Sequence, residues 1–209
     1  CIGMAACSWL AFVDRQVLAV LSPTILKETG LSAQDYGTAF SFFFYVYAAA
    51  NLLWGSLLDY LGLRFGMVAA VAIWSVASAS HGLMSGFWGF AFARGLLGLG
   101  EGATFPGGLR AAVESLPSNR RARGIATSFS GGTLGAIVTG PIAIPIALRF
   151  GGWRIAFLLS GLLGLAWILL WLVVGRPPYL PKSEHKPKKI TWPNPLERRF
   201  WALVFSYAL

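Results

Sequence analysis

Six apolar stretches, each long enough to cross a lipid bilayer, dominate the sequence. A helix that spans the hydrocarbon core needs about 20 mainly apolar residues, and helices satisfy their own backbone hydrogen bonds in lipid. Charged residues make up only 12% of the 209 residues, against about 25% in a typical soluble domain. We therefore predict an all-α membrane protein, with spans over residues 2–26, 36–58, 65–84, 87–110, 124–148 and 153–174.

Polar segments divide the chain into a bundle, a linker and the beginning of a further helix. Residues 1–174 are predicted to form a six-helix N-terminal bundle. Residues 175–199 are rich in Pro and Lys, which prevents a continuous helix, and we interpret them as a basic cytoplasmic linker. Residues 200–209 begin another apolar run that is too short to span, so we expect a fragment that lacks a C-terminal six-helix half.

The distribution of Lys and Arg predicts the orientation in the membrane. Cytoplasmic loops carry an excess of basic residues, and the loops after the second, fourth and sixth spans are the basic ones here. The opposite face has only Lys27, Arg149 and Arg154. The N-terminus and the 175–199 linker are therefore expected in the cytoplasm, and short loops favour a bacterial inner membrane. The net charge of +9 is explained by this face, without nucleic acid as a partner. The basic side chains of the inner face are Arg64, Arg110, Arg120, Arg121, Arg123, Arg176, Lys182, Lys186, Lys188, Lys189, Arg198 and Arg199.

Four charged residues lie at depth in the predicted spans, away from their ends: Asp14, Arg15, Arg94 and Glu101. Each costs about 2.5 to 3.5 kcal/mol at the centre of a membrane helix, so they indicate a functional site. Arg94 and Glu101 are seven residues apart and share a helix face at about 10 Å separation. The simplest arrangement pairs Asp14 with Arg94 and leaves Arg15 and Glu101 beside a water-filled cavity. The alternative is an ionic lock that only fixes helix packing.

The charges of this set predict a mechanism. Two carboxylates and two guanidinium groups sum to zero, so an organic anion gains little by entering while all are ionised. Protonation of one carboxylate makes the site +1, and an Arg can then bind a substrate carboxylate in bidentate fashion. Neighbouring positive charge favours the ionised acid, so the acid better separated from Arg is the better proton carrier. In the arrangement above, that acid is Glu101.

Small residues and a helix cap predict local structure. Gly98 with Gly102, and Gly131 with Gly135, have the small-xxx-small spacing that lets membrane helices approach closely; the alternative is that they tolerate kinks. Ser32 followed by Asp35 resembles a capping box at a helix start. Gly62 is expected in a short turn.

Several segments resemble the major facilitator superfamily. "GSLLDYLGLRFG" (residues 55–66) is similar to the signature of its loop between the second and third helices, although Tyr60 and Phe65 replace basic positions. "FVDRQVLAVLSPTI", "YVYAAANLLWGSLLDYLG", "RGLLGLGEGATFPGG" and "RFGGWRIAFLLSGLLGL" resemble its anion:cation symporter branch, which includes bacterial sugar-acid transporters. "LDYLGLRFG" and "ALRFGGWR" fall on opposite membrane faces, as inverted repeats do.

This resemblance implies the N-terminal half of a twelve-helix fold, with two inverted three-helix repeats, and a role for each candidate residue. Arg15 would bind the substrate carboxylate, with Tyr47 and Asn51 facing the substrate; Asn51 stands where the family commonly has Gln. The proton-coupling network would be Asp14, Arg94 and Glu101. Asp59, with Arg64, would form the gate that closes the cytoplasmic side.

The function predicted from these features is proton symport of a small organic anion across a lipid bilayer by alternating access. A sugar acid such as a hexuronate, aldonate or aldarate is the expected substrate, and the absent half would complete the site. The alternatives are an organic-anion exchanger and a transporter-like anion sensor or scaffold. His81 and His185 are expected to be solvated. The sequence has no Cys/His cluster, phosphate-binding loop or nucleophilic triad, so we expect no enzyme, cofactor or metal site.

Overall fold

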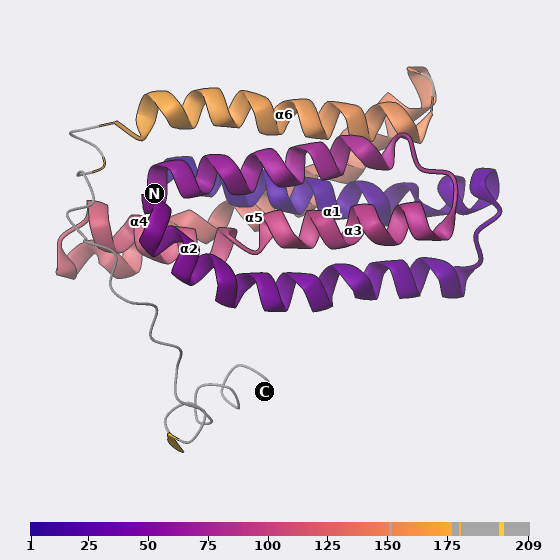
Figure 1. Ribbon diagram of the computed structural model, residues 1–209. Coiled ribbons are helices and arrows are strands. Elements are labelled where there is room, and N and C mark those ends of the chain that lie inside the picture. Colours follow the sequence, from indigo (N-terminus) through magenta and orange to yellow (C-terminus); the bar gives the residue numbers. More distant parts are fainter. Residues whose placement is uncertain (151, 177–179, 181–196, 199–209) are drawn as a thin grey trace.

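Long apolar helices fold into one bundle in the computed structural model, which describes residues 1–150, 152–176, 180 and 197–198 (Figure 1). No strand occurs in these ranges. The predicted linker and the beginning of the seventh helix fall almost entirely outside them. The helices are α1 (Ile2–Thr29), α2 (Ala33–His81), α3 (Phe87–Glu101), α4 (Thr104–Ser115), the 3₁₀ helix η1 (Ser118–Arg120), α5 (Arg121–Arg149) and α6 (Trp153–Val174).

Helix α2 consists of two arms joined at Gly62. Its first turn has the predicted capping box: Ser32 Oγ accepts a hydrogen bond from the Asp35 amide, and the Asp35 carboxylate accepts one from the Ser32 amide. Gly62 has φ 74° and ψ 156°, a conformation that glycine adopts without steric cost. The first arm (residues 33–61) and second arm (residues 63–81) therefore run in opposite directions (Figure 1), as the predicted turn requires.

Within the residues that the structure describes, four helical segments are long and apolar enough to cross a membrane: α1, α2, residues 118–149 and α6. The predicted span over residues 87–110 is divided instead, because α3 ends at Glu101 and α4 begins at Thr104. The amide of Gly102 still bonds to the carbonyl of Gly98 at 3.0 Å. Helix α4 therefore continues in the direction of α3, and Glu101 lies at their junction.

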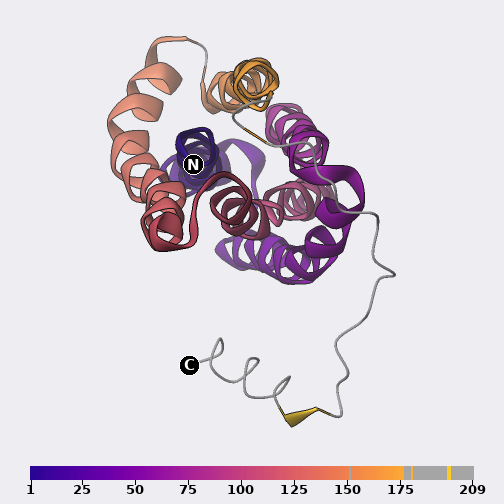
Figure 2. The same ribbon diagram turned by 90° about the vertical axis from the view of Figure 1, so that its left-hand side faces the viewer.

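Glycines bring two pairs of helices into close contact, as predicted from their spacing. Helix α1 packs mainly on α5, and α2 packs mainly on α3 and α6. A Cβ at Gly98 would lie 2.6 Å from the carbonyl oxygen of Phe43 in α2, and one at Gly102 would lie 2.6 Å from the Ala50 Cβ. Gly131 and Gly135 face the backbone of α1 in the same way. Seen along the bundle, α1 lies between α5 and the second arm of α2, and α3 lies between the two arms of α2 (Figure 2).

Substitution of Gly131 by Ala is expected to destabilise the protein by about 1 to 3 kcal/mol, the usual cost of overpacking. The added methyl group would overlap the Ala5 carbonyl of α1, which cannot move without moving the helix. Gly140→Ala in the same helix is the control, because a Cβ there meets nothing within 4 Å. Thermal unfolding of the full-length protein in detergent measures both. Equal melting temperatures for the two variants would contradict the close α1–α5 contact.

Candidate functional site

An ion pair between α1 and α3 lies at the centre of the candidate site. Arg15 Nε donates to Glu101 Oε2 at 2.6 Å; Glu101 is fully buried, whereas 21% of the Arg15 side chain is exposed. Asp14 and Arg94 form no salt bridge or hydrogen bond with each other in the described residues. The predicted Asp14–Arg94 pair is therefore wrong. The reason is that Asp14 and Arg15, as neighbours on a helix, point about 100° apart, and it is Arg15 that reaches the end of α3.

The Arg15–Glu101 pair also contradicts the argument by which Glu101 was chosen as the proton carrier, namely that it is the acid better separated from Arg. Glu101 bonds directly to a guanidinium group, and Asp14 is the acid without such a bond. Each carboxylate retains one oxygen with no hydrogen-bond partner in the described part of the chain, Asp14 Oδ2 and Glu101 Oε1. Both acids are therefore buried with incomplete hydrogen bonding, although only Glu101 has a bonded countercharge.

Three aromatic rings surround the Arg15 guanidinium. Its central carbon lies 4.7 Å from the ring centre of Tyr47, 5.0 Å from that of Phe43 and 5.2 Å from that of Phe12. Contacts of this kind attract a cation to the ring face and restrict the side chain. Sequence analysis missed Phe12 and Phe43. Their spacing was the available signal, since Phe12 precedes Arg15 by three residues and Phe43 precedes Tyr47 by four.

Two of the three predicted substrate-binding residues are thus brought together, Arg15 and Tyr47. Asn51 lies one turn further along the first arm of α2, and its Nδ2 donates to the carbonyl of Tyr47 at 2.8 Å. Both Tyr47 and Asn51 are half-buried. The Asn51 side chain is therefore partly held by its own helix, and its amide oxygen is available to a hydroxyl donor.

Asp14 faces two serines that sequence analysis did not select. Ser78 Oγ, in the second arm of α2, lies 2.8 Å from Asp14 Oδ1 and 2.6 Å from Ser160 Oγ of α6. Asp14, Ser78 and Ser160 are all buried. No spacing rule connects residues from three helices, so this cluster had no signal in the sequence.

Arg94 is fully buried, and none of its guanidinium nitrogens has a hydrogen-bond partner in the described residues. Its charge still acts on Asp14 and Glu101. An uncompensated guanidinium is costly in such surroundings. Arg94 therefore contributes positive charge to the surroundings of both acids without a hydrogen bond to either.

His81 is buried, so the expectation that it is solvated is wrong. Its ring stacks on Phe157 at 5.0 Å between ring centres, and Nδ1 lies 2.7 Å from the carbonyl of Ala77. The turn after α2 returns the chain as α3, and Phe90 of α3 covers the histidine edge. His185 lies outside the described residues.

The two predicted gating residues lie near the Gly62 turn but have different partners. Asp59 is 73% exposed and accepts a hydrogen bond from Arg110 of α4 at 2.8 Å; Arg110 also pairs with Glu114 at 2.5 Å. Arg64 instead donates to the carbonyl of Leu172 in α6. Asp59 therefore links the first arm of α2 to α4, whereas Arg64 links the second arm to α6.

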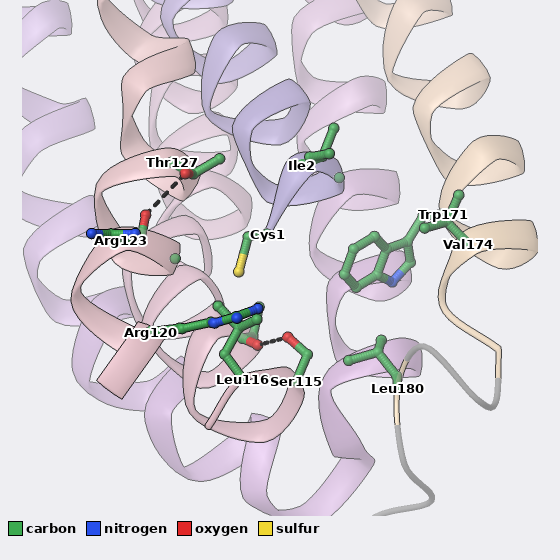
Figure 3. A pocket seen from close by; sticks show the side chains of 13 residues that line it. Cys1, Ile2, Ser115, Leu116, Arg120, Arg123, Thr127, Trp171, Val174 and Leu180 are labelled. Atoms are coloured by element: carbon green, nitrogen blue, oxygen red, sulfur yellow. Dashed lines mark hydrogen bonds between the residues drawn. The ribbon is translucent and has the colours of Figure 1, made fainter. Parts of the chain in front are cut away.

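A cavity of about 560 Å³ lies between the first turn of α1, the end of α4, the beginning of α5 and the end of α6 (Figure 3). The Arg120 guanidinium points into it beside Cys1, and Trp171 forms the opposite wall (Figure 3). None of the predicted site residues lines it. The charged site is therefore separate from this cavity.

Asp59→Asn is expected to change the free energy of unfolding by less than about 1 kcal/mol, because an exposed ion pair contributes little. Uptake by the full-length protein is expected to fall several-fold, because the link to Arg110 is weakened. Glu114→Gln is the matched control, since it affects the same arginine within one helix. Thermal unfolding and uptake in liposomes measure the two effects. Unchanged uptake in Asp59→Asn would show that the predicted gate is wrong.

Comparison with curated proteins gives relatives that are named transporters of organic anions. The D-galactonate transporter of Escherichia coli O6:H1 is 30% identical over 217 residues, covering 96% of this chain and 50% of that protein. The hexuronate transporter of Escherichia coli K12 is 29% identical over 169 residues, covering 81% and 39%. The probable sulfoacetate transporter SauU of Cupriavidus necator is 35% identical over 165 residues, covering 78% and 38%. The chain thus spans between about two fifths and half of these proteins.

Solved structures share the fold. A bacterial homolog of the human lysosomal transporter Spinster, in an inward-facing and unoccupied conformation, gives a TM-score of 0.75 at 23% identity, over 99% of this chain and 48% of that one. The proton:xylose symporter XylE gives 0.61 at 16% identity, over 83% and 43%. The helices therefore form half of a known membrane-transporter fold, as predicted.

The family model described as Major Facilitator Superfamily matches residues 4–209. This match covers nearly the whole chain and agrees with the relatives and with the fold. The resemblance inferred from the sequence motifs is thereby confirmed: this all-helical, integral membrane chain belongs to the major facilitator superfamily.

Proposed function

We propose that this chain forms the N-terminal half of a carrier that imports a small organic anion together with protons. The observation that carries the proposal is the Arg15–Glu101 ion pair, buried on the Glu101 side and partly exposed on the Arg15 side. A guanidinium group at the edge of a membrane site is suited to bind a carboxylate. The ion-pair partner of Arg15 is Glu101, an acid that can take up a proton.

Competition for Arg15 would couple the two bound species. While Glu101 is ionised, it neutralises Arg15 through Nε. A proton on Glu101 removes that charge, and the remaining nitrogens of Arg15 can then bind a substrate carboxylate in bidentate fashion. The surrounding aromatic rings would hold the guanidinium in place during this exchange. Proton and anion would therefore bind together.

The charge count supports symport. With Asp14, Arg15, Arg94 and Glu101 ionised, the set is neutral, and it is neutral again with one proton and one monovalent anion bound. A proton alone or an anion alone leaves a net charge, which is costly at membrane depth. The empty and fully loaded states are thus the ones best suited to the rocking motion of alternating access.

A sugar acid is the substrate class that the neighbouring side chains favour. Tyr47 is beside Arg15, and one turn away lies the amide oxygen of Asn51, which accepts no hydrogen bond in the described part of the chain, so both can bond hydroxyl groups next to a carboxylate. The relatives are named for hexuronate, D-galactonate and sulfoacetate, which are all small organic anions. We place the carrier in a bacterial inner membrane with the Asp59–Arg110 link on the cytoplasmic side, because the basic loops lie there.

Glu101→Gln is expected to abolish accumulation of a sugar acid driven by a pH gradient, while exchange of internal for external substrate continues. Glutamine cannot release Arg15 by taking up a proton. The assay uses full-length protein in liposomes with radiolabelled D-galactonate and D-glucuronate. Accumulation against a gradient by Glu101→Gln would contradict the role of Glu101. Wild-type protein that only exchanges substrate, without response to the pH gradient, would contradict symport itself.

Arg15→Lys is expected to raise the KM for the sugar acid about ten-fold or more, since lysine keeps the charge but loses the planar fork and the ring contacts. Arg154→Lys is the matched control. Arg154 also pairs with an acid, Glu28, and lies over an aromatic ring, that of Trp153, but at the opposite end of α1 from the N-terminus. Initial uptake rates at several substrate concentrations give both values. A KM for Arg15→Lys equal to that of the control would exclude Arg15 from substrate binding.

A further inference from the structure

Asp14, Ser78 and Ser160 form a chain of hydrogen bonds that crosses three helices. Asp14 Oδ1 of α1 contacts Ser78 Oγ of α2 at 2.8 Å, Ser78 Oγ contacts Ser160 Oγ of α6 at 2.6 Å, and Ser160 Oγ contacts the carbonyl oxygen of Phe157 at 3.0 Å. All three side chains are buried. The described helices therefore shield these three side chains from bulk water.

The number of available hydrogens determines in which protonation state of Asp14 all three contacts can be hydrogen bonds at once. Three contacts need three hydrogens, and a serine hydroxyl supplies one each. The carbonyl of Phe157 can only accept, so Ser160 donates to it, and Ser78 then donates to Ser160. All three contacts are hydrogen bonds at the same time only when Asp14 is a neutral carboxylic acid that donates to Ser78. When Asp14 is ionised, Ser78 donates to Asp14 Oδ1, and Ser160 can donate to Ser78 or to the Phe157 carbonyl but not to both.

Ser78 differs in this respect from other buried serines of the bundle. Ser75 Oγ bonds to the carbonyl of Val71 and Ser128 Oγ to that of Gly124, each within its own helix. This bond to the preceding turn is the common arrangement for serine in a helix. The Ser78 hydroxyl makes no such bond and instead connects its helix to α1 and α6.

Three charged groups of α1 and α3 act on Asp14. Arg94 of α3 and Arg15 of α1 act on it electrostatically, and so does Glu101 of α3, but no guanidinium nitrogen bonds to it. Among the other groups of α2, buried His81 lies one turn beyond Ser78 and bonds to its own helix.

We propose that Ser78 and Ser160 are positioning residues that form a hydroxyl relay for Asp14. The proposal rests on the proton coupling described under Proposed function. With a proton on Asp14, the relay runs from Asp14 through Ser78 and Ser160 to the Phe157 carbonyl. When Asp14 loses that proton, Ser78 turns to donate to the carboxylate and Ser160 turns to donate to Ser78. The Phe157 carbonyl then loses the Ser160 hydrogen, so the state of Asp14 is transmitted from α1 to α6.

Infrared difference spectroscopy of the full-length protein in liposomes tests the relay, with pH as the variable and no substrate present. The carbonyl stretching band that Asp14→Asn removes is the band of protonated Asp14. We expect Ser78→Ala to move this band to higher frequency, because the acid loses its hydrogen-bond acceptor. Ser160→Ala should move it less, in the same direction. Ser75→Ala is the matched control, one turn away in the same helix, and should leave the band in place.

Transport supplies the second measurement. Ser78→Ala is expected to lower accumulation of D-galactonate driven by a pH gradient about ten-fold, roughly the effect of losing one buried hydrogen bond, and Ser78→Thr should restore it. If Ser78→Ala does not fold, Ser160→Ala carries the test. An unchanged band in Ser78→Ala and Ser160→Ala, or no band removed by Asp14→Asn, would overturn the relay. Wild-type protein that shows the band but no pH-driven uptake would refute the proposed symport and leave the relay geometry standing.

Discussion

The ion pair between Arg15 and Glu101 is the interaction on which the rest of the candidate site depends. A single guanidinium or carboxylate at membrane depth is costly, and each group here lowers the cost of the other. Glu101 can be fully buried at the α3–α4 junction because Arg15 reaches it from α1. Arg15 in turn remains partly exposed, and the rings of Tyr47, Phe43 and Phe12 lie beside its guanidinium.

Close helix packing sets the position of this pair. Gly98 lies against the backbone of Phe43 and Tyr47, so the absence of a side chain at Gly98 brings the first arm of α2 near enough for both rings to reach Arg15. On the other side of α1, Gly131 and Gly135 allow α5 to approach equally closely. Small residues without functional groups of their own thus determine the distance between the side chains of the site.

Polar contacts at the two ends of the bundle hold the helices that carry the site. Glu28 at the end of α1 accepts hydrogen bonds from Trp153 and Arg154 at the beginning of α6. At the opposite end, Asp59 and Arg64 connect the two arms of α2 to α4 and α6 respectively. Gly62 turns the chain between those arms. The charged site lies between these two ends, in a bundle whose core includes two clusters of apolar residues.

The sequence by itself determined the helical membrane fold, the turn at Gly62, the glycine contacts and the family, because apolar length, glycine spacing and local motifs are properties of contiguous residues. It also selected the buried charges, since a charge in an apolar span stands out wherever its partner lies. Only the tertiary structure decided that Arg15 bonds Glu101 while Arg94 does not bond Asp14, that Asp14 faces Ser78 and Ser160, and that His81 is buried. These partners come from different helices, and their distances depend on helix rotation and crossing geometry, which no spacing within one segment encodes.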